Sequence, residues 1–220
     1  SSIFFNGVAP ETALMGHSMG GGASFLAADS LCSNGNTNFK TLVGYAPAES
    51  STNGVSSINS ALSVTVPSVV FSGSNDGVTP AVDHHTPMYN NLASSCKTFI
   101  NVLGGGHCYF ANTNTNCDFG ESTSSTGISI TREEQQDIAQ DLTNLWLDYM
   151  LKGDCDAKES FHEVCKNIIE LEIDFDIKDM GNFYEILDNG EISPNKNEMF
   201  YDCISSYFED EKIKDEDFFV

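Results

Sequence analysis

The sequence predicts an α/β fold: a parallel sheet with flanking helices. Short apolar runs that end at glycine or serine alternate with segments of helical spacing, and this alternation is typical of a parallel sheet. The chain has 220 residues, 40% of them hydrophobic, which is enough for one domain with a buried core, with or without an appendage. It contains no run of 18 uninterrupted apolar residues, which excludes a membrane-spanning helix.

Four segments have the composition of buried strands, because short apolar runs bounded by turn residues are typical of parallel sheets. The predicted strands are residues 12–16, 39–46, 67–73 and 98–103. Between them, residues 19–29 and 87–92 show helical spacing. The stretch 48–63 is rich in Ser, Asn and Thr and predicts a loop with a short helix.

The clearest helix is predicted for residues 131–152. Thr131 is followed three residues later by Glu134, as in a capping box, and Gly153 marks the end. Apolar residues recur at spacings of three and four, which predicts a stripe facing the core. That stripe consists of Ile138, Leu142, Leu145, Trp146, Tyr149 and Met150.

The charge density changes near residue 153. Residues 1–152 carry 12 acidic and 4 basic side chains, a net of -8, whereas residues 153–220 carry 20 and 6, a net of -14. We therefore predict a main domain over 1–153 and an acidic C-terminal extension over 154–220. Within the extension we expect a helix at 161–171, a hairpin turn at 188–191 and a solvated charge run at 209–217.

The total net charge of -22 repels phosphate groups and excludes nucleic acid and anionic membranes as partners.

The element Gly16-His17-Ser18-Met19-Gly20 has the G-x-S-x-G pattern and stands between a predicted strand and a predicted helix. This is the context of a nucleophile elbow, a sharp turn that lifts a serine clear of the sheet. We expect glycines on both sides of the serine to avoid clashes that a Cβ would create. Ser18 is therefore the predicted nucleophile. The backbone N–H of Met19, at the helix start, is the predicted donor to an oxyanion.

Two further polar residues follow later strands. Asp76 lies in the loop after the third strand, and His107 follows three glycines after the fourth, on a loop expected to be flexible enough to bring the imidazole to Ser18. The order Ser, Asp, His along the chain is that of an α/β-hydrolase. His107 is the predicted general base and Asp76 the carboxylate that orients it. This chemistry requires no metal or organic cofactor.

Other clusters of reactive side chains fit a site less well. Adjacent histidines on an extended chain point to opposite faces, so Asp83, His84 and His85 are rejected as a metal site and expected at surface positions. Asp118 follows His107 and is in the wrong order to be the acid. Cys108 is expected to be half of a disulfide or a buried thiol rather than a nucleophile.

These motifs resemble secreted bacterial α/β-hydrolases of the polyesterase–lipase–cutinase type. That group includes poly(ethylene terephthalate) hydrolases, with neighbours among the chlorophyllase-like and dienelactone-hydrolase-like esterases. The resemblance covers about residues 10–155 and rests on GHSMGGGAS (16–24), FSGSNDGVTP (71–80) and GGGHCYFAN (104–112). It implies the Ser18–His107–Asp76 triad, a substrate pocket that includes Val78 and Met19, and carboxylic esters, among them lipid esters and polyesters, as substrates. It also implies secretion, as does a count of seven cysteines, which favours an oxidising compartment.

Three features depart from this group. His17 stands where many polyester hydrolases have Trp, which favours a general esterase. Neither Gly73 nor Tyr109 is cysteine, so the disulfide that braces the acid and base loops in some relatives is absent, and Cys108 and Cys117 are candidates to close a nearby loop instead. Only 17 residues precede Ser18. The group it resembles has four strands before the nucleophile strand and takes a second oxyanion donor from a loop after the third, so the resemblance implies that these are missing here and that the nucleophile strand is an exposed edge.

The sequence leaves three functions open. The first is a serine esterase, lipase or cutinase-like enzyme that acts through an acyl-enzyme. A serine peptidase or thioesterase on the same fold would use the same triad. The third is an inactive fragment whose acidic tail binds a partner or belongs to a sorting or attachment module.

Overall fold

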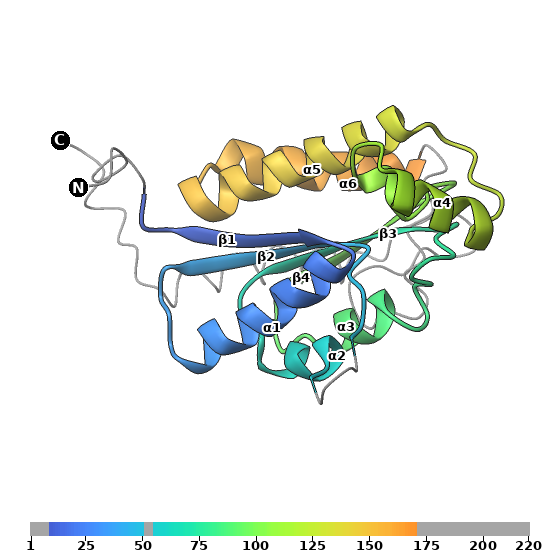
Figure 1. Cartoon of the computed structure of the whole chain (residues 1–220). Helices are drawn as coiled ribbons and strands as arrows, with labels where there is room; N and C mark the ends of the chain where they lie inside the picture. The colour runs from blue at the N-terminus through green and yellow to red at the C-terminus, as the bar shows by residue number, and fades with distance from the viewer. Residues whose placement is uncertain (1–8, 51–54, 171–220) are drawn as a thin grey trace, which may run out of the picture. The chain divides into compact units, whose positions relative to one another are not determined.

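The computed structural model describes residues 9–50 and 55–170, and they form a four-stranded parallel sheet with helices on both faces (Figure 1). The strands are β1 (Thr12–His17), β2 (Phe39–Tyr45), β3 (Ser68–Gly73) and β4 (Lys97–Val102), and they are neighbours in chain order. Every neighbouring pair is parallel, so each connection crosses over the sheet. The predicted α/β class is confirmed. The predicted hairpin turn at 188–191 and charge run at 209–217 lie outside the described residues.

The helices form two layers. On one face of the sheet lie α1 (Met19–Ser33), α2 (Ser57–Ser60) and α3 (His85–Asn91), and on the other lie α5 (Arg132–Lys152) and α6 (Cys155–Glu170) (Figure 1). Two short 3-10 turns, η2 (Ala61–Ser63) and η3 (Cys108–Phe110), and α4 (Thr115–Ser124) complete the order. Each helix on this list is too short or too polar to serve as a membrane span.

Strand β1 lies at the edge of the sheet, next to β2 alone among the described strands. None of its residues is fully buried, and Met15 is 50% exposed. The expectation that the nucleophile strand is an exposed edge is therefore confirmed among the described strands, whereas the prediction of a buried strand at residues 12–16 is wrong in its burial. Strand β3 fits the prediction, since all six of its residues are buried.

Helix α5 has both predicted ends. Thr131 accepts a hydrogen bond from the Glu134 amide and Glu134 reaches back to the Thr131 amide, which completes a capping box, and Gly153 ends the helix in the left-handed conformation with φ 70°. The predicted stripe is partly right, because Ile138 and Leu145 are only half-buried. The fully buried positions are Gln135, Ala139, Leu142, Thr143, Trp146, Tyr149 and Met150.

Helix α6 packs against α5. The ring of Phe161 lies 5.3 Å, between centroids, from the ring of Trp146. Trp146 in turn donates a hydrogen bond from Nε1 to Oγ1 of Thr41 on β2, at 2.7 Å. The helix predicted for 161–171 therefore exists, and it begins earlier, at Cys155. The division of the chain at residue 153 stays a prediction.

Candidate active site

Ser18 occupies the sharp turn between β1 and α1. Its backbone has φ 57° and ψ -125°, a conformation that costs a non-glycine residue about 1–3 kcal/mol. Hydrogen bonds hold it there: the Ser18 amide donates to the Tyr45 carbonyl at 3.0 Å, and the Ser18 carbonyl accepts from the amides of Gly22 and Ala48 at 3.0 and 2.8 Å. The strain is therefore maintained by β2 and the loop after it.

The glycines around Ser18 allow close approach, although not all those predicted do so. A Cβ on Gly16 would lie 2.2 Å from the carbonyl oxygen of Gly20, and one on Gly22 would lie 2.1 Å from the carbonyl oxygen of Ala48. A Cβ on Gly20 would meet nothing within 4 Å. The expectation that both glycines of the pentapeptide are sterically required is correct for Gly16 and wrong for Gly20, because α1 packs on its neighbours through Gly21 and Gly22 instead.

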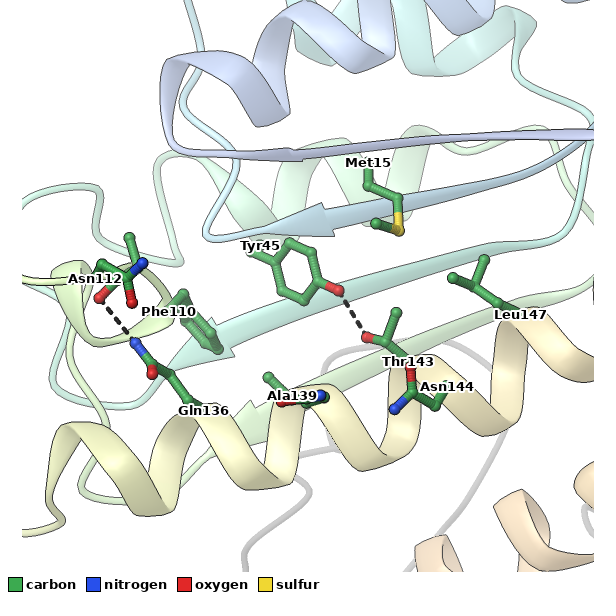
Figure 2. A pocket seen from close by; sticks show the side chains of 11 residues that line it. Met15, Tyr45, Phe110, Asn112, Gln136, Ala139, Thr143, Asn144 and Leu147 are labelled. Carbon is green, nitrogen blue, oxygen red and sulfur yellow. Dashed lines mark hydrogen bonds between the residues drawn. The ribbon is translucent and has the colours of Figure 1, made fainter. Parts of the chain in front are cut away.

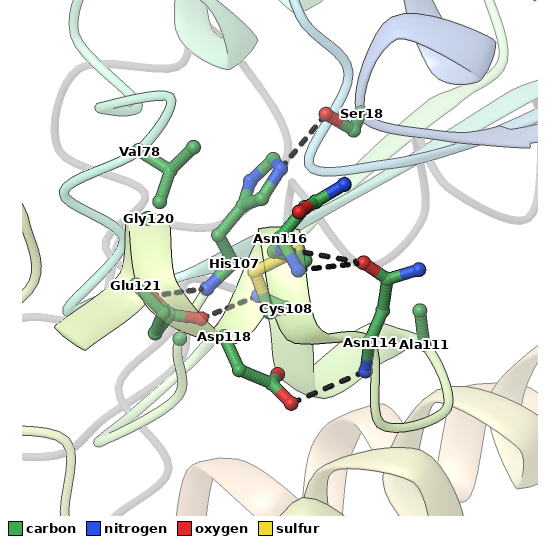
Figure 3. Close-up of a disulfide and its surroundings, with 12 residues drawn as sticks. Ser18, Val78, His107, Cys108, Ala111, Asn114, Asn116, Asp118, Gly120 and Glu121 are labelled. Carbon is green, nitrogen blue, oxygen red and sulfur yellow. Dashed lines mark hydrogen bonds between the residues drawn. A yellow bond between two sulfur atoms is a disulfide. The ribbon is translucent and has the colours of Figure 1, made fainter.

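Three predicted residues meet at the carboxyl ends of β1, β3 and β4. Nε2 of His107 lies 2.8 Å from Oγ of Ser18 (Figure 3). Nδ1 of His107 lies 2.8 Å from Oδ2 of Asp76. Because a carboxylate only accepts, His107 carries its proton on Nδ1, and Nε2 is left to accept from the Ser18 hydroxyl. Asp76 and His107 are 7% and 1% exposed, so this hydrogen-bond chain is shielded from water up to the serine.

Hydrogen bonds from His107 and from its own loop keep Asp76 in the carboxylate form. The amides of Val78 and Thr79 donate to Oδ1 at 2.9 and 2.7 Å, and the Thr79 hydroxyl donates to Oδ2 at 2.9 Å. Burial alone would raise the pKa of this carboxyl. The hydrogen bond and charge of His107 and the Thr79 amide outweigh burial and keep the pKa below its ordinary value.

The glycine loop that carries His107 is clamped. The amide of Gly106 donates to Oε1 of Gln135 at 2.9 Å, and Nε2 of Gln135 donates to the Gly106 carbonyl at 2.7 Å. A Cβ on Gly105 would lie 2.8 Å from the same Gln135 oxygen. The expectation of a flexible loop that swings the imidazole is therefore corrected: these glycines let the backbone approach α5 closely enough to be held.

Glu121 holds the other side of His107. This buried glutamate on α4 accepts from the amides of His107 and Cys108, at 3.1 and 2.5 Å, and from the hydroxyl of Ser125. Sequence reasoning missed it because α4 itself was not predicted. Its residues are mostly polar, and its start is set by Asn114, whose side chain accepts from two amides of the first turn.

A disulfide lies directly beside His107. Cys108 and Cys117 are joined, with 5.7 Å between their Cα atoms, and the bond ties η3 to α4 (Figure 3). Arg132 adds a second tie, since its guanidinium donates to the carbonyls of Cys108 and Ala111 and pairs with Asp118 at 2.5 Å. Asp118 is excluded as the acid because it follows His107 in the chain. In the structure Asp118 pairs with Arg132 of α5 instead.

His17 packs against His107 rather than lying free. Its Nε2 donates to the His107 carbonyl at 2.9 Å, and the two ring centroids are 4.7 Å apart. Burial, and then the neighbouring His107, lower the pKa of His17, which favours the neutral ring. A neutral ring adds no positive charge beside the proposed base.

The two histidines expected at the surface have different positions. Nδ1 of His84, which is half-buried, accepts from the amide of Glu49 at 2.9 Å. His85 is 0% exposed, with Ser72 and Thr79 at its ring nitrogens, so the surface prediction is wrong for this residue. The helical turn at 84–85 directs the second ring inward against β3, which the pattern of two adjacent histidines does not reveal.

The residues predicted to contact substrate lie close to the triad in sequence. Met19 is 80% exposed at the start of α1, where its amide has no acceptor within the helix. Val78 is half-buried, two residues after Asp76.

A separate open groove of about 460 Å³ lies between the edge of the sheet and α5, lined by Met15, Tyr45 and Leu147 among others (Figure 2). None of the triad residues lines this groove.

A parallel sheet that presents a serine on a strained strand-to-helix turn, with a histidine and an aspartate at neighbouring strand ends, defines an α/β-hydrolase. The family model of the PET hydrolase-like proteins, PETase, matches residues 6–130, and the chain belongs to that family. No curated protein matches the chain.

Proposed function

We propose that this chain is a serine hydrolase of carboxylic esters that acts through an acyl-enzyme. Ser18 is the nucleophile, His107 the general base and Asp76 the carboxylate that orients it. The observation that carries the proposal is the continuous chain of two 2.8 Å hydrogen bonds from Ser18 Oγ through His107 to Asp76. PET hydrolase-like membership supports esters as the substrate class.

The proposed reaction has two halves. Ser18 Oγ attacks the ester carbonyl carbon while His107 Nε2 takes the hydroxyl proton, and the amide of Met19 donates to the oxyanion that forms. When the carbon–oxygen bond breaks, His107 returns the proton to the departing alkoxide, and the acyl group stays on Ser18. Water then attacks the acyl carbon while His107 Nε2 takes one of its protons. The bond to Ser18 Oγ breaks, His107 returns the proton to Ser18 and the carboxylic acid leaves, and Asp76 stabilises the imidazolium in both halves.

Labelling with a fluorophosphonate tests the nucleophile. The probe should add one adduct to the intact chain, and peptide mass spectrometry should locate it on Ser18. The Ser18→Ala variant should remain unlabelled, and Ser56→Ala, in which an N-cap serine changes, should label like the parent chain. A folded parent chain that takes up no probe would contradict the proposal.

The acyl pocket is tested separately. We propose that Val78 contacts the acyl chain, so Val78→Ala should move the preferred p-nitrophenyl ester toward longer acyl groups. Val82 is the matched control because it is 74% exposed on the same loop, and Val82→Ala should leave the preference unchanged. Equal preferences in both variants would remove Val78 from the pocket.

We also propose that the protein works outside the cytosol. Disulfides persist in oxidising compartments, and the Cys108–Cys117 bond lies directly beside the proposed base.

A further inference from the structure

A second histidine, His85, is fully buried behind Asp76. It is the first residue of α3, and its Nε2 lies 3.7 Å from Oδ2 of Asp76. A buried imidazole has a desolvation cost that hydrogen bonds must offset. Both ring nitrogens have such partners: Ser72 Oγ lies 2.9 Å from Nδ1, and Thr79 Oγ1 lies 3.0 Å from Nε2.

The direction of each proton follows from Asp76. A carboxylate only accepts, so the hydroxyl proton of Thr79 is committed to Asp76 Oδ2. The Thr79 oxygen can then only accept from His85, which places the His85 proton on Nε2. Nδ1 of His85 is left to accept from the Ser72 hydroxyl. The donors therefore run in one direction, from Ser72 through His85 and Thr79 to Asp76.

Thr79 also touches the proposed base. Its Oγ1 lies 2.8 Å from Nδ1 of His107, so the Nδ1 proton is shared between Asp76 Oδ2 and the Thr79 oxygen. This sharing requires the Thr79 lone pairs to face both histidines. Burial lowers the pKa of His85 to about 3, so the ring is neutral near pH 7 and does not compete with His107 for the charge of Asp76.

We propose that His85 and Thr79 are positioning residues for the Asp76–His107 pair, with His85 fixing the Thr79 hydroxyl so that it donates to the carboxylate. The inference rests on the proposed function, because it assigns a role within the same triad. Two contacts carry it: the 3.0 Å approach of His85 Nε2 to Thr79 Oγ1 and the 2.9 Å bond from Thr79 Oγ1 to Asp76 Oδ2.

Thr79→Val removes the hydroxyl at nearly constant volume. The variant loses the bond that Thr79 donates to Asp76 and the bonds that it accepts from His85 and His107. We expect the lost bond to Asp76, of ordinary strength, to lower kcat for a p-nitrophenyl ester about three- to tenfold, with KM nearly unchanged. Thr79→Ser keeps the hydroxyl and should restore most of kcat. Rates are expressed per fluorophosphonate-labelled site, so that a reduced folded fraction does not count as a loss of kcat.

A double-mutant cycle tests whether His85 acts through Thr79. His85→Leu should lower kcat about threefold, His85→Gln should recover part of it by returning a donor, and Thr79→Val with His85→Leu should be no slower than Thr79→Val alone. If His85 only fills space, the two losses should instead multiply. His84→Ala, which changes the neighbouring ring, should leave kcat unchanged.

Two readouts separate positioning from general support. The acid limb of the kcat/KM profile should move in Thr79→Val, by up to about one pH unit. The Asp76 carboxylate loses a hydrogen-bond donor that stabilises its negative charge, and His107 lies beside that carboxylate. His17 and Glu121 contact His107, and His85 interacts with it electrostatically; the substitution changes none of these three residues. The low-field proton resonance of His107 Nδ1 should shift in the same variant and needs no turnover. Failure of the parent chain to label would refute the proposed function, whereas an unmoved resonance in Thr79→Val would refute the positioning role.

Discussion

Oε1 of Glu121 accepts a hydrogen bond from the backbone amide of His107 at 3.1 Å, and the carboxylate that does so is buried. His107, the proposed base, is therefore oriented from two directions, by Asp76 at its ring and by Glu121 at its backbone. Since Cys108 donates to the other oxygen of the same carboxylate, one side chain on α4 fixes two consecutive peptide units of the base loop.

Removing this carboxylate should damage both stability and activity. Glu121→Ala leaves two buried amides without acceptors, and we expect a loss of at least about 2 kcal/mol of unfolding free energy, together with a lower kcat. Urea unfolding and ester hydrolysis measure the two effects. Glu163→Ala, which changes an exposed glutamate on α6, should alter stability by less than about 0.5 kcal/mol. Similar values for the two variants would show that Glu121 does not hold the loop.

Two glycines of the G-x-S-x-G element should respond differently to alanine. Gly16→Ala places a methyl group 2.2 Å from a backbone oxygen, so this variant should unfold at a much lower temperature or fail to fold. Gly20→Ala meets nothing within 4 Å and replaces glycine within α1, so its melting temperature should be unchanged or slightly higher. Circular dichroism melts provide the comparison, and an equal drop in both variants would contradict the geometry of the turn.

The Cys108–Cys117 disulfide, next to the proposed base, closes a short loop of the chain and should therefore stabilise the folded state. Chain-entropy arguments give about 2–3 kcal/mol for a bond that spans nine residues. Cys117→Ser should lower the melting temperature, and dithiothreitol should lower that of the parent chain to the same value without affecting the variant. Cys155→Ser is the control because Cys155 is an exposed free cysteine, and it should melt like the parent. A parent chain insensitive to dithiothreitol would contradict the prediction.

Stability should depend on pH through His85. Its folded pKa of about 3 lies below its ordinary 6.5, so the unfolded chain takes up a proton as pH falls below 6.5 while the folded chain does not. The stabilisation is complete above pH 6.5 and declines by about 1.4 kcal/mol per pH unit toward pH 3. The deficit of His85→Leu in urea unfolding should therefore shrink by about 2 kcal/mol between pH 6.5 and 5. Leu142→Ala, which truncates a buried apolar side chain of α5 and removes no titrating group, should show a deficit that stays constant over the same interval.

Much of the triad could be predicted because its signals are local. The elbow, the loop after β3 and the glycines before His107 each stand directly after an apolar strand, and the capping box of α5 is a four-residue pattern. Parallel strands bring such loops to one edge, which is why three short motifs sufficed to place Ser18, Asp76 and His107 together.

The supporting contacts could not be predicted in this way. Gln135 looks like an ordinary polar residue of α5, and its partner Gly106 is 29 residues away. Glu121 belongs to a helix whose composition has no apolar face, and His85 is buried only because α3 turns it against β3. Each depends on how distant elements pack, which no local spacing records.

The most direct test of the proposed function is hydrolysis of p-nitrophenyl esters from acetate to palmitate by the parent chain and by Ser18→Ala. Circular dichroism should first confirm that both are folded. We predict turnover by the parent chain and none above background by Ser18→Ala, with the best acyl length separating an esterase from a lipase. Equal turnover by the two chains, or none by a folded parent chain, would contradict the proposal that Ser18 is the nucleophile of an ester hydrolase.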